Sequence, residues 1–184
     1  IDVVRATANS VNTVYAQMNV EVGPAATLDV ARRAGVCTSW ARADEDCTVF
    51  EGQEVPANVL GTASPHPLDM AQAYNTFAAQ GVRTEPFIVA QVATPDGEVV
   101  HTGGVEGERV FAEDVMADTT YALSQVVEQG SGTKARAVGH PVAGKTGTSQ
   151  NNRSAWFIGY TTQLTTAVAM YQVGVDEEGR AVEE

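Results

Sequence analysis

Lysine is scarce in this 184-residue chain, which contains only Lys134 and Lys145. Lys145 begins the sequence Lys-Thr-Gly-Thr, abbreviated K-T-G. On a strand edge its ammonium would attract a carboxylate and increase the acidity of nearby hydroxyls, and the Thr146 hydroxyl could hydrogen-bond to that carboxylate. Gly147 leaves space for an extended peptide beside the strand, so the backbone N–H of Thr148 could contribute to an oxyanion hole. The motif therefore predicts a site for a peptide that carries a carboxylate.

A Ser-x-Asn sequence, Ser10 and Asn12, lies far upstream at the start of a predicted helix. Ser10 could relay a proton, and the side-chain amide of Asn12 could bind an amide of the substrate. A serine in this position is also typical of a helix N-cap, so both roles remain open for Ser10. The predicted catalytic residues are Ser10, Asn12 and Lys145, and the predicted substrate-binding residues are Thr146, Gly147 and Thr148.

Two other patterns use the same lysines. Residues 139–146 match the P-loop pattern G-x-x-x-x-G-K-(S/T), but a P-loop needs a buried strand before it and a helix after it, and the flanking sequence indicates neither. Residues 131–134 (Ser-Gly-Thr-Lys) match S-x-x-K, a nucleophile motif that requires serine at a helix N-terminus. Because this stretch follows a predicted helix and is rich in glycine, we interpret it as a loop.

The elements that must position these residues are predicted from hydrophobic spacing and from glycine and proline. Helices are expected over residues 11–22, 24–34, 68–80 and 113–129, a loop over 48–66, and strands over 141–148, 155–160 and 165–173. Pro-Asp-Gly at 95–97 predicts a hairpin. In outline, residues 1–82 are mainly helical, 86–101 form the hairpin, 113–129 a helix and 141–174 the sheet strands. The acidic end, 176–184, is expected to fray.

Composition excludes some functions. The formal net charge is −12, from 11 Lys and Arg against 23 Asp and Glu, whereas a nucleic-acid-binding face needs clustered basic residues. At 43% hydrophobic residues the chain can bury a core, and it has no apolar run of the roughly 18 residues that a membrane helix needs.

Cys37 and Cys47 bracket a polar stretch and predict a disulfide, which indicates an oxidising, extracytoplasmic compartment. Two unrelated buried thiols are the alternative. No histidine lies near them, so we expect no metal site. The three histidines are scattered and are interpreted as structural or surface residues, namely His66, His101 and His140.

The order of these motifs resembles the transpeptidase domain of bifunctional class A penicillin-binding proteins. Residues 8–13 resemble the second motif of that family, and 143–149 with 155–160 resemble the third motif and the strand after it. Between them, 60–83 resemble the family's G-x-x-x-x-S-P-L-x-M-A-x-A-Y-x-x-F-A-x-x-G stretch, and 126–135 its V-V-x-x-G-T-G-T-x-A loop, which explains the S-x-x-K match. The resemblance covers almost the whole chain.

The resemblance implies an α+β fold like that of penicillin-binding proteins and serine β-lactamases, with an antiparallel sheet flanked by helices. It also implies peptidoglycan cross-linking, in which a serine attacks a D-Ala-D-Ala stem peptide, D-alanine leaves, and an amine from a neighbouring stem resolves the acyl-enzyme. β-Lactams would acylate the same serine, and no metal or organic cofactor is required. Family members carry a membrane anchor and a glycosyltransferase domain upstream, which places this domain on the extracytoplasmic face of the bacterial membrane.

In the family, S-x-x-K precedes Ser-x-Asn, and this chain begins shortly before Ser10. We therefore expect no nucleophile in this chain: residues 1–184 would be the C-terminal part of one transpeptidase domain, inactive alone and completed by a companion segment that carries S-x-x-K. The alternatives are a penicillin-recognising sensor that stays acylated, and a degenerate domain kept for protein–protein contact.

Overall fold

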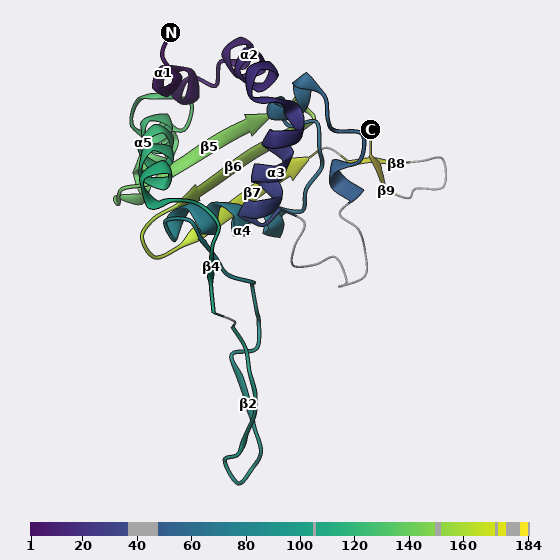
Figure 1. Cartoon of the computed structure of the whole chain (residues 1–184), viewed down its shortest axis with the longest axis vertical. Helices are drawn as coiled ribbons and strands as arrows, with labels where there is room; N and C mark the ends of the chain where they lie inside the picture. The colour runs from purple at the N-terminus through teal and green to yellow at the C-terminus, as the bar shows by residue number, and fades with distance from the viewer. Residues whose placement is uncertain (37–47, 105, 150–151, 172, 176–180, 184) are drawn as a thin grey trace.

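The K-T-G residues lie on an antiparallel sheet in the computed structural model of the chain (Figure 1), which describes all residues except 37–47, 105, 150–151, 172, 176–180 and 184. The strand order is β5-β6-β7, so β6 is central and one edge of β5 is open in the described part of the chain. The strands are β5 (Ala143–Thr148), β6 (Ser154–Tyr160) and β7 (Thr165–Tyr171).

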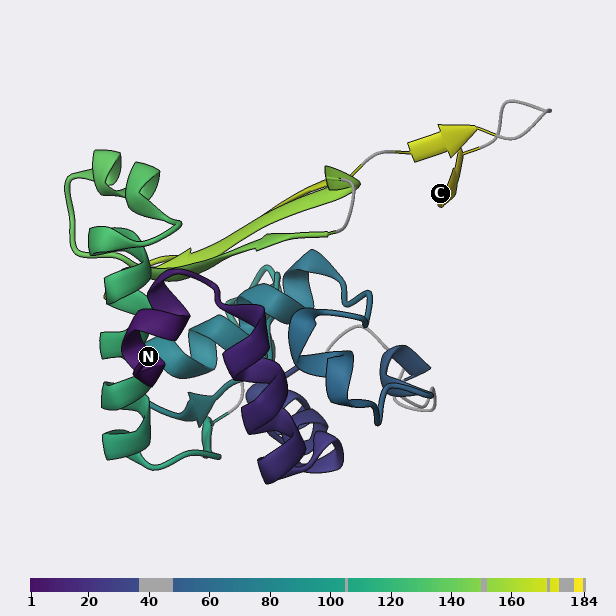
Figure 2. The same cartoon turned by 90° about the horizontal axis from the view of Figure 1, so that it is seen from above.

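Helices cover one face of this sheet. Figure 2 shows them below the sheet, whereas the short 3-10 helix η3 (Thr133–Val138) lies above it. The helices are α1 (Val3–Ala8), α2 (Asn12–Val22), α3 (Pro24–Ala34), α4 (Pro67–Ala78) and α5 (Glu113–Gln129). Each helix that the structure describes falls short of the length or the apolar character that a membrane span needs.

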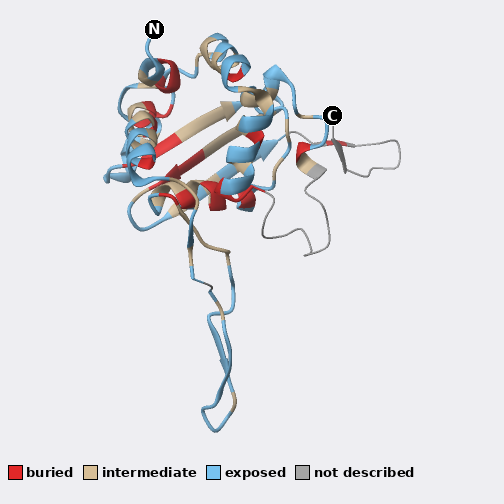
Figure 3. Ribbon diagram, in the orientation of Figure 1, coloured by how far each residue is buried: buried red, intermediate tan, exposed pale blue. Residues whose placement is uncertain are grey.

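Part of the core lies between the helices and the sheet (Figure 3). Val126 and Val127 of α5 are fully buried, and the small residues Ala6 and Ala8 allow α1 to pack closely against α5. A buried cluster of Leu123, Ala143 and Tyr160 joins α5 to the first two sheet strands, with aromatic residues of α4 packed around it. The strand that carries Lys145 is thereby fixed to the helical layer.

A long hairpin arm, residues 82–109, projects away from this body (Figure 1). At its base β1 (Val82–Arg83) pairs with β4 (Glu108–Arg109), and farther out β2 (Gln91–Ala93) pairs with β3 (Val99–Thr102). The hairpin forms around Pro-Asp-Gly as expected, but β2 begins at Gln91, later than the apolar run from residue 87 suggested, although the Ala90 oxygen still accepts a hydrogen bond from the Gly103 N–H at 2.8 Å.

Several expected boundaries differ from the structure. α4 begins at Pro67 because proline fits the first helical turn, and β5 begins at Ala143, since Pro141 has no N–H to donate. The predicted loop over 48–66 contains the 3-10 helices η1 (Thr48–Phe50) and η2 (Pro56–Leu60), and the glycine-rich loop after α5 leads into η3.

The expectation that the whole acidic end frays is wrong for residues 181–183. There β9 (Ala181–Glu183) pairs with β8 (Val173–Val175) to form a separate two-stranded sheet. The predicted disulfide between Cys37 and Cys47 lies outside the described residues.

Candidate active site

Ser10 and Lys145, predicted to act together, are in direct contact. The Lys145 Nζ donates hydrogen bonds to the Ser10 Oγ at 2.7 Å and to the backbone oxygen of Thr146 at 2.9 Å. Burial lowers the pKa of Lys145 from its ordinary value. No carboxylate of the described residues pairs with this ammonium, and one of its three protons has no acceptor there. The site thus presents a partly desolvated cation to an incoming anion.

The backbone at Ser10 makes this contact possible. Ser10 has a positive φ of 53°, in the connection between α1 and α2, where its N–H bonds to the Thr7 oxygen and the N–H of Val11 bonds to the Ala6 oxygen. Val11 is the N-cap of α2 and makes no side-chain cap. Capping, the alternative considered for Ser10, is therefore wrong, because α2 begins too late and the Ser10 hydroxyl faces Lys145.

Asn12 is the first residue of α2 and is exposed. Its side-chain amide has no hydrogen-bond partner among the described residues. Both donors and the acceptor of this amide are therefore available to a ligand on the same side of the molecule as Ser10.

The other K-T-G residues extend along the open edge of β5. Gly147 pairs with Trp156, and a Cβ at this position would lie 3.3 Å from the Trp156 Cβ. Thr148 is exposed at the end of the strand. Because side chains alternate along a strand, Thr146 faces the side of the sheet opposite to Lys145.

Ser131 contacts the K-T-G strand, which sequence analysis did not anticipate. Its Oγ lies 2.6 Å from the Thr146 Oγ1, and either hydroxyl can donate. Ser131 precedes η3, whose N-cap is Gly132, so it does not share a helix turn with the exposed Lys134 as an S-x-x-K nucleophile would. In the sequence, only the glycines on both sides of Ser131 indicate that this loop packs closely against neighbouring elements.

The P-loop alternative fails on geometry. Lys145 lies inside β5, which continues to Thr148, and the strand β6 follows after a short connection. The helix N-terminus that would bind phosphate is therefore not formed at this lysine. Across the described residues, no three His, Cys, Asp or Glu side chains are grouped so that they could hold a metal ion.

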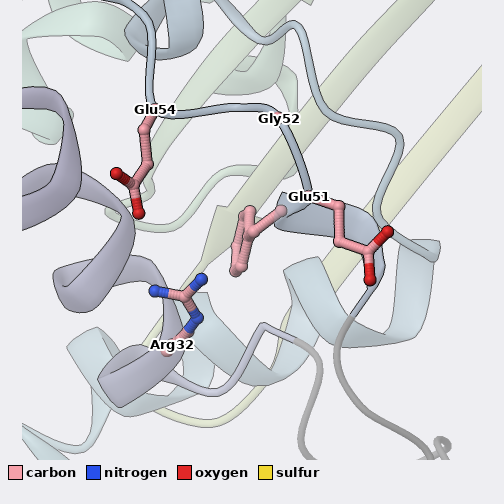
Figure 4. A pocket seen from close by; sticks show the side chains of 5 residues that line it. Arg32, Glu51, Gly52 and Glu54 are labelled. Atoms are coloured by element: carbon pink, nitrogen blue, oxygen red, sulfur yellow. The ribbon is translucent and has the colours of Figure 1, made fainter.

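An open pocket lies elsewhere, beside α3 and η1 (Figure 4). It is lined by Arg32, Phe50, Glu51, Gly52 and Glu54, and the Arg32 guanidinium lies over the Phe50 ring, 5.0 Å from its centroid. None of these residues contributes to the contacts of Ser10, Lys145 or Ser131. The three histidines, His66, His101 and His140, are all exposed, in agreement with their interpretation as surface residues.

Comparison with known proteins identifies the family. The profile of the penicillin binding protein transpeptidase domain matches residues 1–183. The chain belongs to this family. Penicillin-binding protein 1A of Mycolicibacterium smegmatis is 36% identical over 171 residues, covering 86% of this chain and 22% of that protein. Penicillin-binding protein 1A of Mycobacterium tuberculosis is 33% identical over 181 residues, covering 91% of this chain and 22% of that protein.

Solved structures of a penicillin-binding protein show the same fold. The chain superimposes on PonA1 of Mycobacterium tuberculosis with a TM-score of 0.80 and 28% identity, covering 98% of this chain and 51% of that one. PonA1 has also been solved in complex with penicillin V, with a TM-score of 0.80 to this chain. The predicted α+β transpeptidase fold is thus confirmed, as part of a domain of the class A penicillin-binding proteins. The chain spans 22% of the length of the 1A relatives.

Proposed function

We propose that this chain supplies the Ser-x-Asn and K-T-G sides of the active site of a serine D,D-transpeptidase that cross-links peptidoglycan and is acylated by β-lactams. The observation that carries the proposal is the 2.7 Å hydrogen bond from the Lys145 Nζ to the Ser10 Oγ. It joins two motifs far apart in the sequence into one proton-transfer unit beside an open strand edge.

The geometry supports a specific division of roles. The stem peptide lies along the β5 edge, where the hydroxyls of Thr146 and Thr148 bind its terminal carboxylate and Gly147 allows its close approach. The Lys145 ammonium lies on the other side of the sheet but reaches the strand edge at the Thr146 backbone oxygen, and from there it attracts the carboxylate. The Asn12 amide binds a peptide group of the substrate. The backbone N–H of Thr148 stabilises the oxyanion that forms at the attacked carbonyl.

Proton transfer passes through Ser10. The nucleophilic serine gives its proton to the lysine of its own S-x-x-K segment as it forms a bond to the carbonyl carbon. The C–N bond to D-alanine breaks, the departing nitrogen takes a proton from the Ser10 hydroxyl, and the proton held by the S-x-x-K lysine restores that hydroxyl. Lys145 stabilises the negative charge that develops on the Ser10 Oγ because its ammonium already donates to that atom. An amine of a neighbouring stem then attacks the acyl carbon, the bond from that carbon to the serine oxygen breaks, and the proton lost by the amine returns to the serine oxygen through Ser10. With a β-lactam, the ring C–N bond breaks and the acyl group remains.

The nucleophile in this proposal belongs to a companion segment with S-x-x-K. The greater length of the 1A relatives supports a larger parent protein, which we propose to be anchored on the extracytoplasmic face of the membrane and to carry a glycosyltransferase domain. The PonA1 complex with penicillin V supports β-lactams as ligands here.

Fluorescent penicillin tests the proposal. The complete domain, this chain together with the companion segment, is expected to become covalently labelled, and the isolated 184-residue chain is not. Peptide mapping of a label to Ser10 or Ser131 of the isolated chain would contradict the assignment. Transfer of a labelled stem peptide to an amine acceptor distinguishes a transpeptidase from a sensor that only stays acylated.

Lys145→Ala in the complete domain should slow acylation by about 100-fold or more, because the proton-relay serine loses its cationic partner. Lys134→Ala is the matched control, since Lys134 is the other lysine, is exposed, and has no partner in the described structure. Stopped-flow labelling measures both. An unchanged rate in the Lys145 variant, or equal losses in the two, would refute the role of Lys145.

A further inference from the structure

The Ser131 hydroxyl is in contact with the residue that the proposed function assigns to carboxylate binding. Ser131 is exposed and Thr146 is half-buried, and their hydroxyl oxygens are 2.6 Å apart. Neither hydroxyl has another hydrogen-bond partner among the described residues. The pair therefore faces solvent at the sheet edge.

The backbone around Ser131 is held in place without help from its side chain. Its N–H donates to the Ala8 oxygen at 2.9 Å, and the N–H groups of Gly130 and Gly132 both donate to the Val126 oxygen, at 3.1 and 2.9 Å. Gly130 also packs so closely on Ala8 that a Cβ there would overlap the Ala8 carbonyl. Because these contacts fix the loop, the Ser131 hydroxyl is not needed to hold it.

Counting protons shows what the pair can bind. Each hydroxyl has one proton and two lone pairs, and the bond between them uses one proton. Whichever hydroxyl donates, one proton remains for a third group. Lys145 donates to the backbone oxygen of Thr146, so positive charge lies nearby and favours an anion as that group. The pair is thus suited to an anionic oxygen of a ligand.

We propose that Ser131 is a positioning residue for carboxylate recognition: it orients the Thr146 hydroxyl so that the pair donates one hydrogen bond to the carboxylate of the stem peptide or β-lactam. This inference rests on the proposed transpeptidase function. It means that the loop of Ser131, which lies outside the K-T-G strand, helps the transpeptidase site to select ligands with a free carboxylate.

The test compares acylation of the complete domain by a penicillin and by the methyl ester of the same penicillin. With Ser131→Ala, the second-order acylation rate constant is expected to fall about tenfold for the free acid and less than about threefold for the ester, because a hydrogen bond to a charged group is worth more than one to a neutral group. Ser131→Thr should restore most of the rate, and the melting temperature of both variants should stay close to that of the wild type.

Ser64→Ala, in the exposed loop before α4, is the matched control and should leave both rate constants unchanged. Equal losses with acid and ester, or no loss with either, would overturn the role of Ser131 while leaving the transpeptidase assignment intact. A wild-type domain that neither probe acylates would instead overturn the proposed function, and this inference with it.

Discussion

Ser10 occupies a backbone conformation that few serines adopt, and its neighbours explain why it stays there. A non-glycine residue in the left-handed region costs about 1–3 kcal/mol. At Ser10 the hydrogen bonds of the turn between α1 and α2 offset this cost, and the hydroxyl oxygen accepts a hydrogen bond from the Lys145 ammonium. The strained backbone thus holds the Ser10 hydroxyl against the partly buried Lys145, the contact on which the proposed proton relay rests.

The lowered pKa of Lys145 leads to a prediction about pH. Burial disfavours the charged form, so the ammonium loses its proton at a lower pH than an ordinary lysine does. Acylation of the complete domain should therefore decline as the pH rises through this lowered pKa. In Lys145→Arg the alkaline decline should disappear, whatever the maximal rate, because a guanidinium stays protonated. Rate–pH profiles measured up to about pH 11 test this.

An alkaline decline that is identical in the wild type and in Lys145→Arg would assign the titration to another group.

The lowered pKa of Lys145 also has a consequence for stability. Between the lowered pKa and the ordinary value the unfolded chain binds more protons at this position, so the contribution of Lys145 makes the fold more stable as pH rises through that window.

The sequence predicts the role of a single residue only where its side-chain chemistry and its place in a short motif point to the same site. Lys145 and Ser10 could be paired in advance because each belongs to a recognisable short pattern. Ser131 could not, because its contact with Thr146 joins a loop to a strand, and no periodicity in the sequence encodes contacts between separate elements. Its match to S-x-x-K was interpreted as a loop and did not point to this contact.

Among the elements, the loop between α5 and η3 has the tightest packing requirement. In Gly130→Ala the new Cβ would overlap the Ala8 carbonyl, and relief requires moving α1 away from α5. We expect a loss of about 2 kcal/mol in the free energy of unfolding, measured by thermal or denaturant unfolding. Because Ala8 lies next to the Ser10 turn, acylation should fall as well.

Gly147→Ala provides the comparison. Its Cβ would meet Trp156 at 3.3 Å, a tight contact that small shifts relieve, so stability should change by less than about 1 kcal/mol. Acylation should nevertheless slow, because the methyl group occupies the strand edge proposed for the peptide. Equal stability losses in Gly130→Ala and Gly147→Ala would show that overlap with the Ala8 carbonyl is not what destabilises the Gly130 variant.

Local signals account for which elements could be foreseen. The structure has α2, α3 and α5 within one residue of the predicted ranges, because apolar spacing and nearby glycine or proline mark their ends. The pairing of β8 with β9 and the helix η3 were not foreseen. A strand pair depends on a partner elsewhere in the chain, and a 3-10 helix has too few residues to show a period.

At the scale of the whole molecule, the body and the arm differ in how firmly they are held. Residues 87–102 of the arm are exposed apart from Thr94, and Ile88 is 89% exposed. In the body, Val126 and Val127 are buried beside the sheet. Hydrogen exchange monitored by mass spectrometry should therefore be fast in β2 and β3 and slow in α5 and β6, because local opening of the arm breaks few buried contacts. Comparable protection in the arm and the body would contradict this.

The ladder between β1 and β4 closes the base of the arm, so the chain enters and leaves the body at one place. A change at the far end, the Pro-Asp-Gly tip, alters neither the distance between the two ends of the base nor any contact of the Ser10 site. The tip is therefore an attachment point for a fluorophore or an affinity tag that could report on the protein while the β5 edge proposed for the substrate remains untouched.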